Sequence, residues 1–518
     1  MNGNTTKGGL TKTRKAKTIK VAPATRAIRL ALATSATMLA LAGSGVTFAG
    51  TCLPTGAIET TCAGIFTDTV NAGDEFPGVI DLTLVLDDSV SITTAPGDIG
   101  VYASWGGDVT VTNYGSVSVE DASAIVAIAY DNDGTVNNYG IVDSTAVTGD
   151  VTAVVVYGAY GATVNNSGTI IAGADPGTSY DATGIQVYGK YATVNNTADG
   201  SIFVGAYNGN AIGATAYGKY ADVTNDGDIT VGSFGGNAGG VIAYGVYSSV
   251  TNNGSIEVAA QGGNAYGVIA LGIYSVDVEN TGTIDVEASG FSIGVYAVSD
   301  YDASIENSGD ISSTSIDKYA VGVVAAGDTA SVENSGSITA LGYDAATGVI
   351  AYGYTSANVS NTGSIDVVAY GIGGTATGIT ATSSGSVYVY SNGTINVTSY
   401  GDGSGPTTAL PYSEGGNATG VNAVSEYYSE GGSQPPSILY GPSDVNVVLG
   451  AANVLNVTAG GNAQGVYAAA LGAGSVYVTN DGTINVEAGN NAYGITAYSD
   501  TGDVYVYNGG SMDVYAYN

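Results

Sequence analysis

One short pattern recurs along most of this chain and constrains its fold more than any other feature. The pattern is an aliphatic residue, any residue, Asn, any residue, Gly, any residue and then Ile or Val, as in Val111–Val117. Spacings between neighbouring copies run from 25 residues, Asn113 to Asn138, to 30 residues, Asn166 to Asn196. A period of this length is typical of proteins that stack one small structural unit on the next. The asparagines of the pattern are Asn113, Asn138, Asn166, Asn196, Asn225, Asn252, Asn280, Asn307, Asn334, Asn361, Asn480 and Asn508.

Each period contains three short runs in which apolar and polar residues alternate. In one period these runs are 241–243, 248–251 and 256–258. Such alternation indicates strands, and the Gly, Asn and Ser residues between the runs favour turns. Three strands this short cannot form a domain alone, but stacked coils pair each strand in parallel with its equivalent in the next coil. We therefore predict an all-β fold, a right-handed parallel β-helix (solenoid) with three strands and about 27–30 residues per coil.

The repeated Asn and Gly are predicted to be structural. Inward positions such as Val250, Ile256 and Val258 should stack on their equivalents in the next coil and form one aliphatic core. Gly at the turns is expected to supply positive φ without steric cost. An Asn at the same corner of every coil can hydrogen-bond the Asn above and below it. We therefore predict that the repeat asparagines form a buried ladder rather than a ligand site.

Basic residues concentrate at the amino-terminal end. Eight of the 11 Lys and Arg residues precede residue 30, no Asp or Glu occurs in the first 50 residues, and the apolar run 30–42 follows. This order predicts a secretory signal peptide over residues 1–49, cleaved at Ala49 or alternatively at Ala42. The apolar run is too short to span a membrane. A basic arm that binds nucleic acid is disfavoured, because the apolar run follows it directly. We expect export through the inner membrane, followed by display at the cell surface or outer membrane, or secretion.

The rest of the chain is strongly acidic. Three Lys residues remain against 45 acidic residues, which gives a net charge of 3 − 45 = −42. This charge repels nucleic acid and anionic lipid, so no nucleic-acid partner is expected. Cys52 and Cys62 lie just after the predicted cleavage site and are predicted to form a disulfide. A metal site is less favoured there, because the chain has no His.

The repeat divides the chain into segments. Residues 50–100 precede the regular copies and are predicted to form an amino-terminal cap, since a bare β-helix end exposes unpaired strands. Residues 101–398 and 444–518 carry the repeats, the second with an open carboxyl-terminal end. Residues 399–443 hold five of the ten prolines and several Gly pairs, so we expect loop excursions from the β-helix. Within them, residues 419–423 resemble the first run of a coil.

Composition argues against several kinds of chemistry. Without His a Ser-His-Asp triad is impossible, and after residue 50 there is no Arg to serve as a polysaccharide lyase base. A hydrolase with paired carboxylates is not excluded, but a turn is favoured for Asp87–Asp88. The Asp131–Gly134 segment resembles the start of a calcium loop and lacks its later Glu. We predict no catalytic residues, no cofactor and no bound metal.

Tyrosine dominates the aromatic residues, with 38 Tyr against 6 Phe. One series recurs eight or nine residues before the repeat Asn and a second five or six residues before it, and alternation points the first of them outward. Stacked rings would stabilise neighbouring strands, and the same amphipathic rings would offer a partner contact area. Trp105, Tyr130 and Tyr352 extend the first series. The candidate binding stripe comprises Tyr157, Tyr188, Tyr217 and Tyr244 of the first series and Tyr160, Tyr191, Tyr220, Tyr247, Tyr274 and Tyr301 of the second.

The Asn-Ser-Gly-Thr-Ile form of the repeat, as at Asn166–Ile170, resembles the passenger regions of autotransporters, and the long basic signal peptide is similar to theirs. The resemblance covers roughly residues 1–49 and 100–518 and implies a β-helix displayed outside the cell. It does not specify an activity, because such passengers serve as adhesins, proteases, esterases and toxins. Autotransporters end in a membrane β-barrel, whereas this chain ends at Asn518 in a repeat strand. The resemblance therefore implies either a truncated gene model or a separately encoded outer-membrane translocator.

Three functions are compatible with these features. The favoured one is a non-catalytic surface or secreted passenger that acts in adhesion, biofilm formation or virulence. It would bind a host or matrix surface ligand through an acidic, tyrosine-rich face. The alternatives are a self-associating structural protein of the cell surface and, less favoured, a carbohydrate-active β-helix enzyme.

Overall fold

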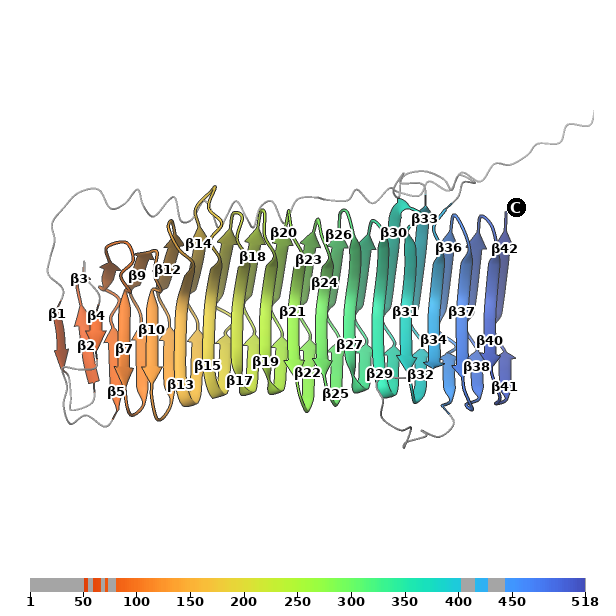
Figure 1. Ribbon diagram of the computed structural model, residues 1–518, viewed down its shortest axis with the longest axis horizontal. Coiled ribbons are helices and arrows are strands. Elements are labelled where there is room, and N and C mark those ends of the chain that lie inside the picture. The colour runs from red at the N-terminus through yellow and green to blue at the C-terminus, as the bar shows by residue number, and fades with distance from the viewer. Residues whose placement is uncertain are drawn as a thin grey trace, which may run out of the picture.

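The described chain forms a single long solenoid. The structure is a computed structural model that describes residues 51–54, 59–66, 70–72, 81–401, 415–426 and 443–517. All elements in these ranges are strands, and they wind into a parallel β-solenoid of about 15 turns with three strands per coil (Figure 1). The predicted all-β, three-stranded coil is therefore confirmed. The predicted signal peptide, both cleavage sites and most of the proline-rich segment lie outside the described residues.

The strands lie on three faces that run the length of the solenoid, and we number the faces in chain order within a coil. Face 1 contains β4 (Val70–Ala72), β7 (Val101–Trp105), β10 (Ile125–Ala129), β21 (Ala265–Gly272), β24 (Ser292–Ser299), β31 (Thr375–Ser383), β34 (Ala418–Glu426), β37 (Ala463–Leu471) and β40 (Ala492–Ser499). Face 2 contains β2 (Glu59–Ala63), β5 (Leu82–Leu86), β8 (Val109–Asn113), β11 (Gly134–Asn138), β22 (Ser275–Asn280), β25 (Asp302–Asn307), β32 (Ser386–Ser391), β35 (Val445–Leu449), β38 (Val476–Asn480) and β41 (Val504–Asn508).

Six long strands continue from face 1 into face 2, so the two faces form one sheet: β13 (Val151–Asn166), β15 (Ala182–Asn196), β17 (Ala211–Asn225), β19 (Ala238–Asn252), β27 (Tyr319–Asn334) and β29 (Ala345–Asn361). Face 3 is a separate sheet of β3 (Ile65–Phe66), β6 (Ser91–Thr93), β9 (Ser116–Glu120), β12 (Ile141–Ala146), β14 (Thr169–Ala174), β16 (Ser201–Ala206), β18 (Asp228–Ser233), β20 (Ser255–Ala260), β23 (Thr283–Ala288), β26 (Asp310–Ser315), β28 (Ser337–Gly342), β30 (Ser364–Ile372), β33 (Thr394–Gly401), β36 (Val454–Ala459), β39 (Thr483–Ala488) and β42 (Ser511–Ala516).

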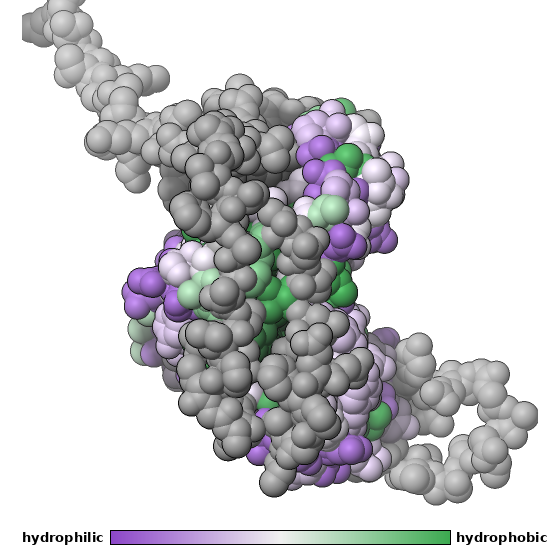
Figure 2. All heavy atoms as spheres, turned by 90° about the vertical axis from the view of Figure 1, so that its left-hand side faces the viewer, coloured by the Kyte–Doolittle hydropathy of each residue, from purple (hydrophilic) through white to green (hydrophobic). Residues whose placement is uncertain are grey.

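Neighbouring coils pair in register, and this register builds the core. Val250 of β19 pairs with Val278 of β22, and Ile256 of β20 pairs with Ile284 of β23. Val250, Ile256 and Val258 are buried, as their alternation predicts. Seen from the end where β1 (Thr51–Pro54) lies, hydrophobic residues occupy the centre of the cross-section and hydrophilic residues its rim (Figure 2). One aliphatic core therefore runs along the solenoid axis.

The first two runs of several coils are not separated as the sequence suggests, because the chain bends from face 1 to face 2 without leaving the strand. Glycines at the bend allow neighbouring backbones to approach closely. A Cβ on Gly218 would lie 2.1 Å from the carbonyl oxygen of Gly189, and a Cβ on Gly245 would lie 2.6 Å from that of Gly218. A pair such as 241–243 and 248–251 thus becomes the single strand β19.

The turn glycines also serve a different purpose from the one predicted. Within the described residues, positive φ occurs at four glycines and at Asp121, none of them in the Asn-x-Gly turns of the ladder. At those turns glycine is needed because a side chain would not fit. A Cβ on Gly254 would lie 2.1 Å from the carbonyl oxygen of Gly227 in the preceding coil. The expectation of positive φ at the repeat turns is therefore wrong, and close stacking of the turns explains the glycine.

The first strands depart from the parallel pattern. The strand β1 (Thr51–Pro54) pairs antiparallel with β2, in a register that places the backbone of Cys52 opposite that of Cys62. Cys62 takes part in a disulfide. From β2 onward, the pairing to β5 is parallel. No helix long and apolar enough to cross a membrane occurs in the part of the chain that the structure describes.

Candidate binding surface

The repeat asparagines line the inner side of the corner between faces 2 and 3. From Asn113 to Asn361, each Nδ2 donates to the Oδ1 of the next Asn at 2.7–2.8 Å. The amides of this run are buried, and neighbouring backbone groups complete their bonding; the N–H of Gly115, for example, donates to Asn113. Amides that bond to one another in the interior cannot reach a ligand, so this geometry favours a structural role.

The ladder is interrupted where the sequence pattern degenerates. Asn361 donates to Ser391 Oγ at 3.3 Å, and the next residue in the column is Leu449, which has no amide. The column resumes at Asn480, which donates to Asn508 at 2.6 Å. After Leu449 the turn is longer than in most coils, as it is after Asn196, and both polar side-chain atoms of its buried Asn453 lack a hydrogen-bond partner.

A second ladder, which the sequence analysis missed, lies at the start of face 1. The backbone N–H of Asn237 donates to Asn210 Oδ1 at 3.1 Å, and that of Asn264 donates to Asn237 Oδ1 at 2.9 Å. Phe291 N–H continues the series to Asn264 at 2.8 Å. The tripeptide Gly-Asn-Ala recurs at each of these asparagines, at 209–211, 236–238 and 263–265, and this repetition was the available signal.

The second tyrosine series forms an uninterrupted outward stack at the corner between faces 1 and 2, which we call the corner stack. Its six rings are 4.8 to 5.6 Å apart, centroid to centroid. Lys190 Nζ lies 4.7 Å from the centroid of the Tyr160 ring, and Lys219 Nζ lies 5.2 Å from that of Tyr220. The members are Tyr160, Tyr191, Tyr220, Tyr247, Tyr274 and Tyr301.

The first series is shorter than predicted. Tyr157, Tyr188, Tyr217 and Tyr244 share one outward column of face 1, and the rings of Tyr188 and Tyr217 stack at 5.1 Å. Burial raises the pKa of both of these phenols. In the next three coils the column contains Leu271, Val298 and Ala326 before Tyr352 restores it.

Trp105 and Tyr130 do not belong to this column, contrary to the sequence-based grouping. Ser104 and Ile128 pair into the column that leads to Tyr157. Trp105 lies one position and Tyr130 two positions further along the chain than the column residue of its own coil, and Trp105 is partly buried against the core. The column lies 8 residues before the repeat Asn at Tyr188 but 9 before it at Ser104 and 10 before it at Ile128, so counting back from the Asn places the two aromatic residues incorrectly.

Face 2 carries two outward columns that change in character along the solenoid, and together they form what we call the face-2 groove. Pairing of successive coils places Asp277, Ser304, Ser331, Asn358 and Tyr388 in the first column. The same pairings place Glu279, Glu306, Glu333, Ser360 and Tyr390 in the second. The acidic row therefore gives way to short polar side chains and then to two tyrosines.

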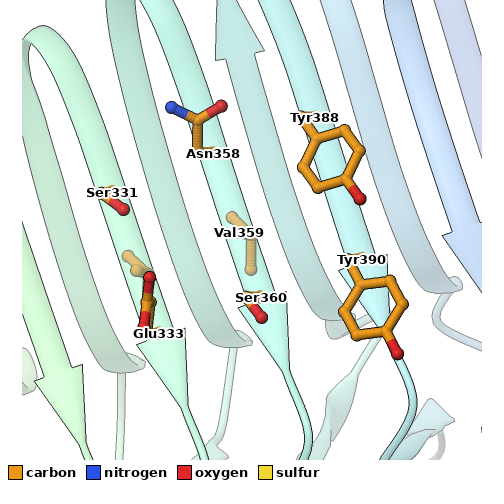
Figure 3. Close-up of a pocket in the computed structure, with 8 residues that line it drawn as sticks. Ser331, Glu333, Asn358, Val359, Ser360, Tyr388 and Tyr390 are labelled. Carbon is orange, nitrogen blue, oxygen red and sulfur yellow. The ribbon is translucent and has the colours of Figure 1, made fainter.

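Two hollows connect along this groove. One of about 360 Å³ lies between β27, β29 and β32, with Ser331 and Glu333 of β27 on one side, Asn358 and Ser360 of β29 in the middle, and the two tyrosine rings of β32 on the other side (Figure 3). A second of about 240 Å³ is lined by the glutamate row and shares Glu333 and Ser360 with the first. Tyr388 is 43% exposed, so its ring is accessible to a ligand.

Carboxyl groups on face 3 are crowded as well as partly buried. Burial raises the pKa of Glu257, and the charges of Asp285 and Glu287 raise it further. Burial raises the pKa of Asp143, on β12, to about 6, and its Oδ1 has no hydrogen-bond partner. In the described residues, no three or more His, Cys, Asp and Glu side chains converge in a way that would hold a metal ion.

Two acidic motifs singled out in the sequence lie in turns. Asp87 Oδ1 accepts the backbone N–H of Ser89 at 2.8 Å, which closes a turn after β5. The Asp131–Gly134 segment leads into β11, and the N–H of Asp133 donates to Asp108 Oδ1 of the preceding coil at 3.1 Å. The carboxylate of Asp87 therefore stabilises its own turn, and that of Asp108 joins the turns of two neighbouring coils.

Comparison with known proteins does not extend these observations. No family model matches the chain, no curated protein is significantly similar to it, and no solved structure matches its fold at a significant level.

Proposed function

We propose that this protein is an exported, non-catalytic binding protein of the cell surface or extracellular matrix, similar to an autotransporter passenger. The observation that carries the proposal is the pair of outward tyrosine columns on adjacent coils, the first series and the corner stack. Large amphipathic rings in a fixed array provide contact area at low entropic cost. The signal-peptide pattern of residues 1–49 supports delivery outside the cytoplasm.

Repetition explains how such a surface would act without a deep pocket. Each coil adds another ring at the strand spacing of about 4.8 Å, so a repetitive ligand can engage many weak contacts at once. A rigid solenoid fixes these contacts before binding, which reduces the ordering cost of association. Adhesion to a host or matrix surface is the function that this arrangement serves best.

The test is replacement of Tyr188, Tyr217 and Tyr244 together by Ser. These side chains point outward, so circular dichroism and thermal unfolding should stay close to the wild type, while adhesion of the exported protein to matrix-coated surfaces should fall several-fold. A matched control changes three exposed tyrosines outside both columns, Tyr114, Tyr139 and Tyr493, to Ser. A folded triple variant that adheres like the wild type would contradict the proposal, as would an equal loss in the control.

A further inference from the structure

We propose that the face-2 groove binds an extended polysaccharide that carries primary amino groups, lying parallel to the solenoid axis. This inference rests on the proposed function, because it names the ligand class for one part of a non-catalytic binding surface. The groove lies on face 2, whereas the tyrosines of the first series lie on face 1.

The aromatic end of the groove has the chemistry that recognises a sugar ring. Tyr388 and Tyr390 come from the same strand, β32, and both rings project outward beside a floor of short side chains (Figure 3). The C–H face of a pyranose packs against such rings, while its hydroxyls need hydrogen-bond partners at the base. Ser331 and Ser360 supply hydroxyls, and the carbonyl oxygen of Asn358 faces the ring of Tyr388 (Figure 3).

The charge of the groove selects among sugars. Glu279, Glu306 and Glu333 are exposed and occupy equivalent positions in three successive coils, so one carboxylate recurs about every 4.8 Å. No Lys or Arg lines either hollow. The repeat distance is close to the length of one hexose unit in an extended chain. Successive β-1,4-linked sugars face opposite sides of an extended chain, so the ammonium groups of every second sugar would meet every second carboxylate of the row. An anionic polymer would instead be repelled by the row and by the chain's net charge of 3 − 45 = −42 after residue 50.

The experiment compares three hexasaccharides by isothermal titration calorimetry on the purified chain without residues 1–49, the form that export would release. They are the glucosamine hexamer, the N-acetylglucosamine hexamer and cellohexaose, which share a β-1,4 backbone and differ at one substituent. We expect the glucosamine hexamer to bind most tightly and its affinity to fall as salt rises, because ion pairing is screened. Equal or tighter binding of either neutral hexamer, or no binding of the glucosamine hexamer, would overturn the proposal.

Variants locate the site. Changing Glu279, Glu306 and Glu333 to Gln should weaken binding roughly fivefold or more and flatten its salt dependence. Changing Tyr388 and Tyr390 to Ser should weaken binding by a similar factor while the salt dependence stays. A charge-matched control changes Asp88, Asp98 and Asp199, exposed carboxylates outside the groove, to Asn. If this control weakens binding as much as the glutamate variant, the ligand responds to net charge and the assignment to the groove is wrong.

The two proposals fail separately. The Tyr188, Tyr217 and Tyr244 variant should bind the glucosamine hexamer as the wild type does, because these residues do not line the groove. Absence of hexamer binding, with adhesion that still depends on that variant, would remove the polysaccharide assignment and leave the proposed function intact. Hexamer binding by a protein that shows no adhesion would keep the polysaccharide assignment and remove the proposed adhesive function.

Discussion

A single asparagine of the buried ladder holds together three coils at once. Asn280 accepts from Asn252 at 2.7 Å and donates to Asn307 at 2.7 Å. Changing Asn280 to Ala leaves a buried donor and a buried acceptor without partners, so we expect a loss of roughly 1–3 kcal/mol in the free energy of unfolding, measured by urea denaturation. Asn253, an exposed neighbour of the ladder, changed to Ala is the control and should cost much less. Equal stability of the Asn280 variant and the wild type would refute a structural ladder.

Asp143 gives the molecule a specific pH dependence. Burial raises the pKa of this carboxyl from 3.8 to about 6, so the folded state binds the proton more tightly than the unfolded chain. The resulting stabilisation is present below pH 3.8 and is lost as pH rises through about 6. Changing Asp143 to Asn should remove this dependence and raise stability at neutral pH by roughly 1–3 kcal/mol. Urea denaturation at about pH 4 and pH 7 tests this; an Asn variant that is less stable than the wild type at neutral pH would show that the charge is needed.

Residue roles were predicted correctly from the sequence where the same position of every coil carries the same type of residue. The ladder asparagines and inward valines such as Val250 follow directly from the repeat and from alternation, because a two-residue period fixes the side of the strand on which a residue lies. Prediction failed where the number of residues between face 1 and the repeat Asn varies. Trp105 was assigned by counting back from Asn113, but in that coil the column residue, Ser104, lies one position further from the Asn than Tyr188 does in its coil. The face-2 groove was not found, because its residues differ from coil to coil and share no motif.

At the scale of elements, the antiparallel pair β1–β2 should act as a covalent clamp on the first coil. Register places Cys52 opposite Cys62, and an eleven-residue loop closed by a disulfide restricts the unfolded segment. Changing Cys62 to Ser should increase hydrogen exchange in β5, which pairs with β2, and leave β19 unchanged. Mass spectrometry of exported wild-type protein should find a mass two hydrogens below that of the dithiol. Two free thiols in that material would disprove the bond.

Strand order was predictable because turn residues mark the ends of most runs, but strand length was not, nor was strand number in the coils where two runs merge. The merging of two runs into β13, β15, β17, β19, β27 and β29 depends on backbone spacing between coils rather than on local propensity. A Gly at such a bend reads as a turn in the sequence, although in the stack it permits a continuous strand. Element boundaries therefore depend on neighbours that lie about one coil away in the chain.

At the scale of the whole molecule, charge opposes the stacking that hydrophobic burial drives. The net charge after residue 50 is 3 − 45 = −42, and among the described residues one ion pair is found, Lys318 with Asp344 at 3.8 Å. Neighbouring coils also place like charges side by side, as in the row Glu279, Glu306 and Glu333. Such self-repulsion destabilises a compact state, and salt reduces it.

The distance between coils sets the salt concentration at which this repulsion is relieved. The Debye length is about 10 Å at 0.1 M and about 3 Å at 1 M ionic strength, whereas neighbouring strands are about 4.8 Å apart. Repulsion between adjacent carboxylates therefore persists at physiological salt, and the melting temperature should continue to rise between about 0.1 and 1 M NaCl. Changing Glu279, Glu306 and Glu333 to Gln should raise the melting temperature at low salt and reduce its increase with salt. If this variant and the wild type show the same increase, repulsion within the glutamate row does not contribute, and the salt effect arises from the remaining surface.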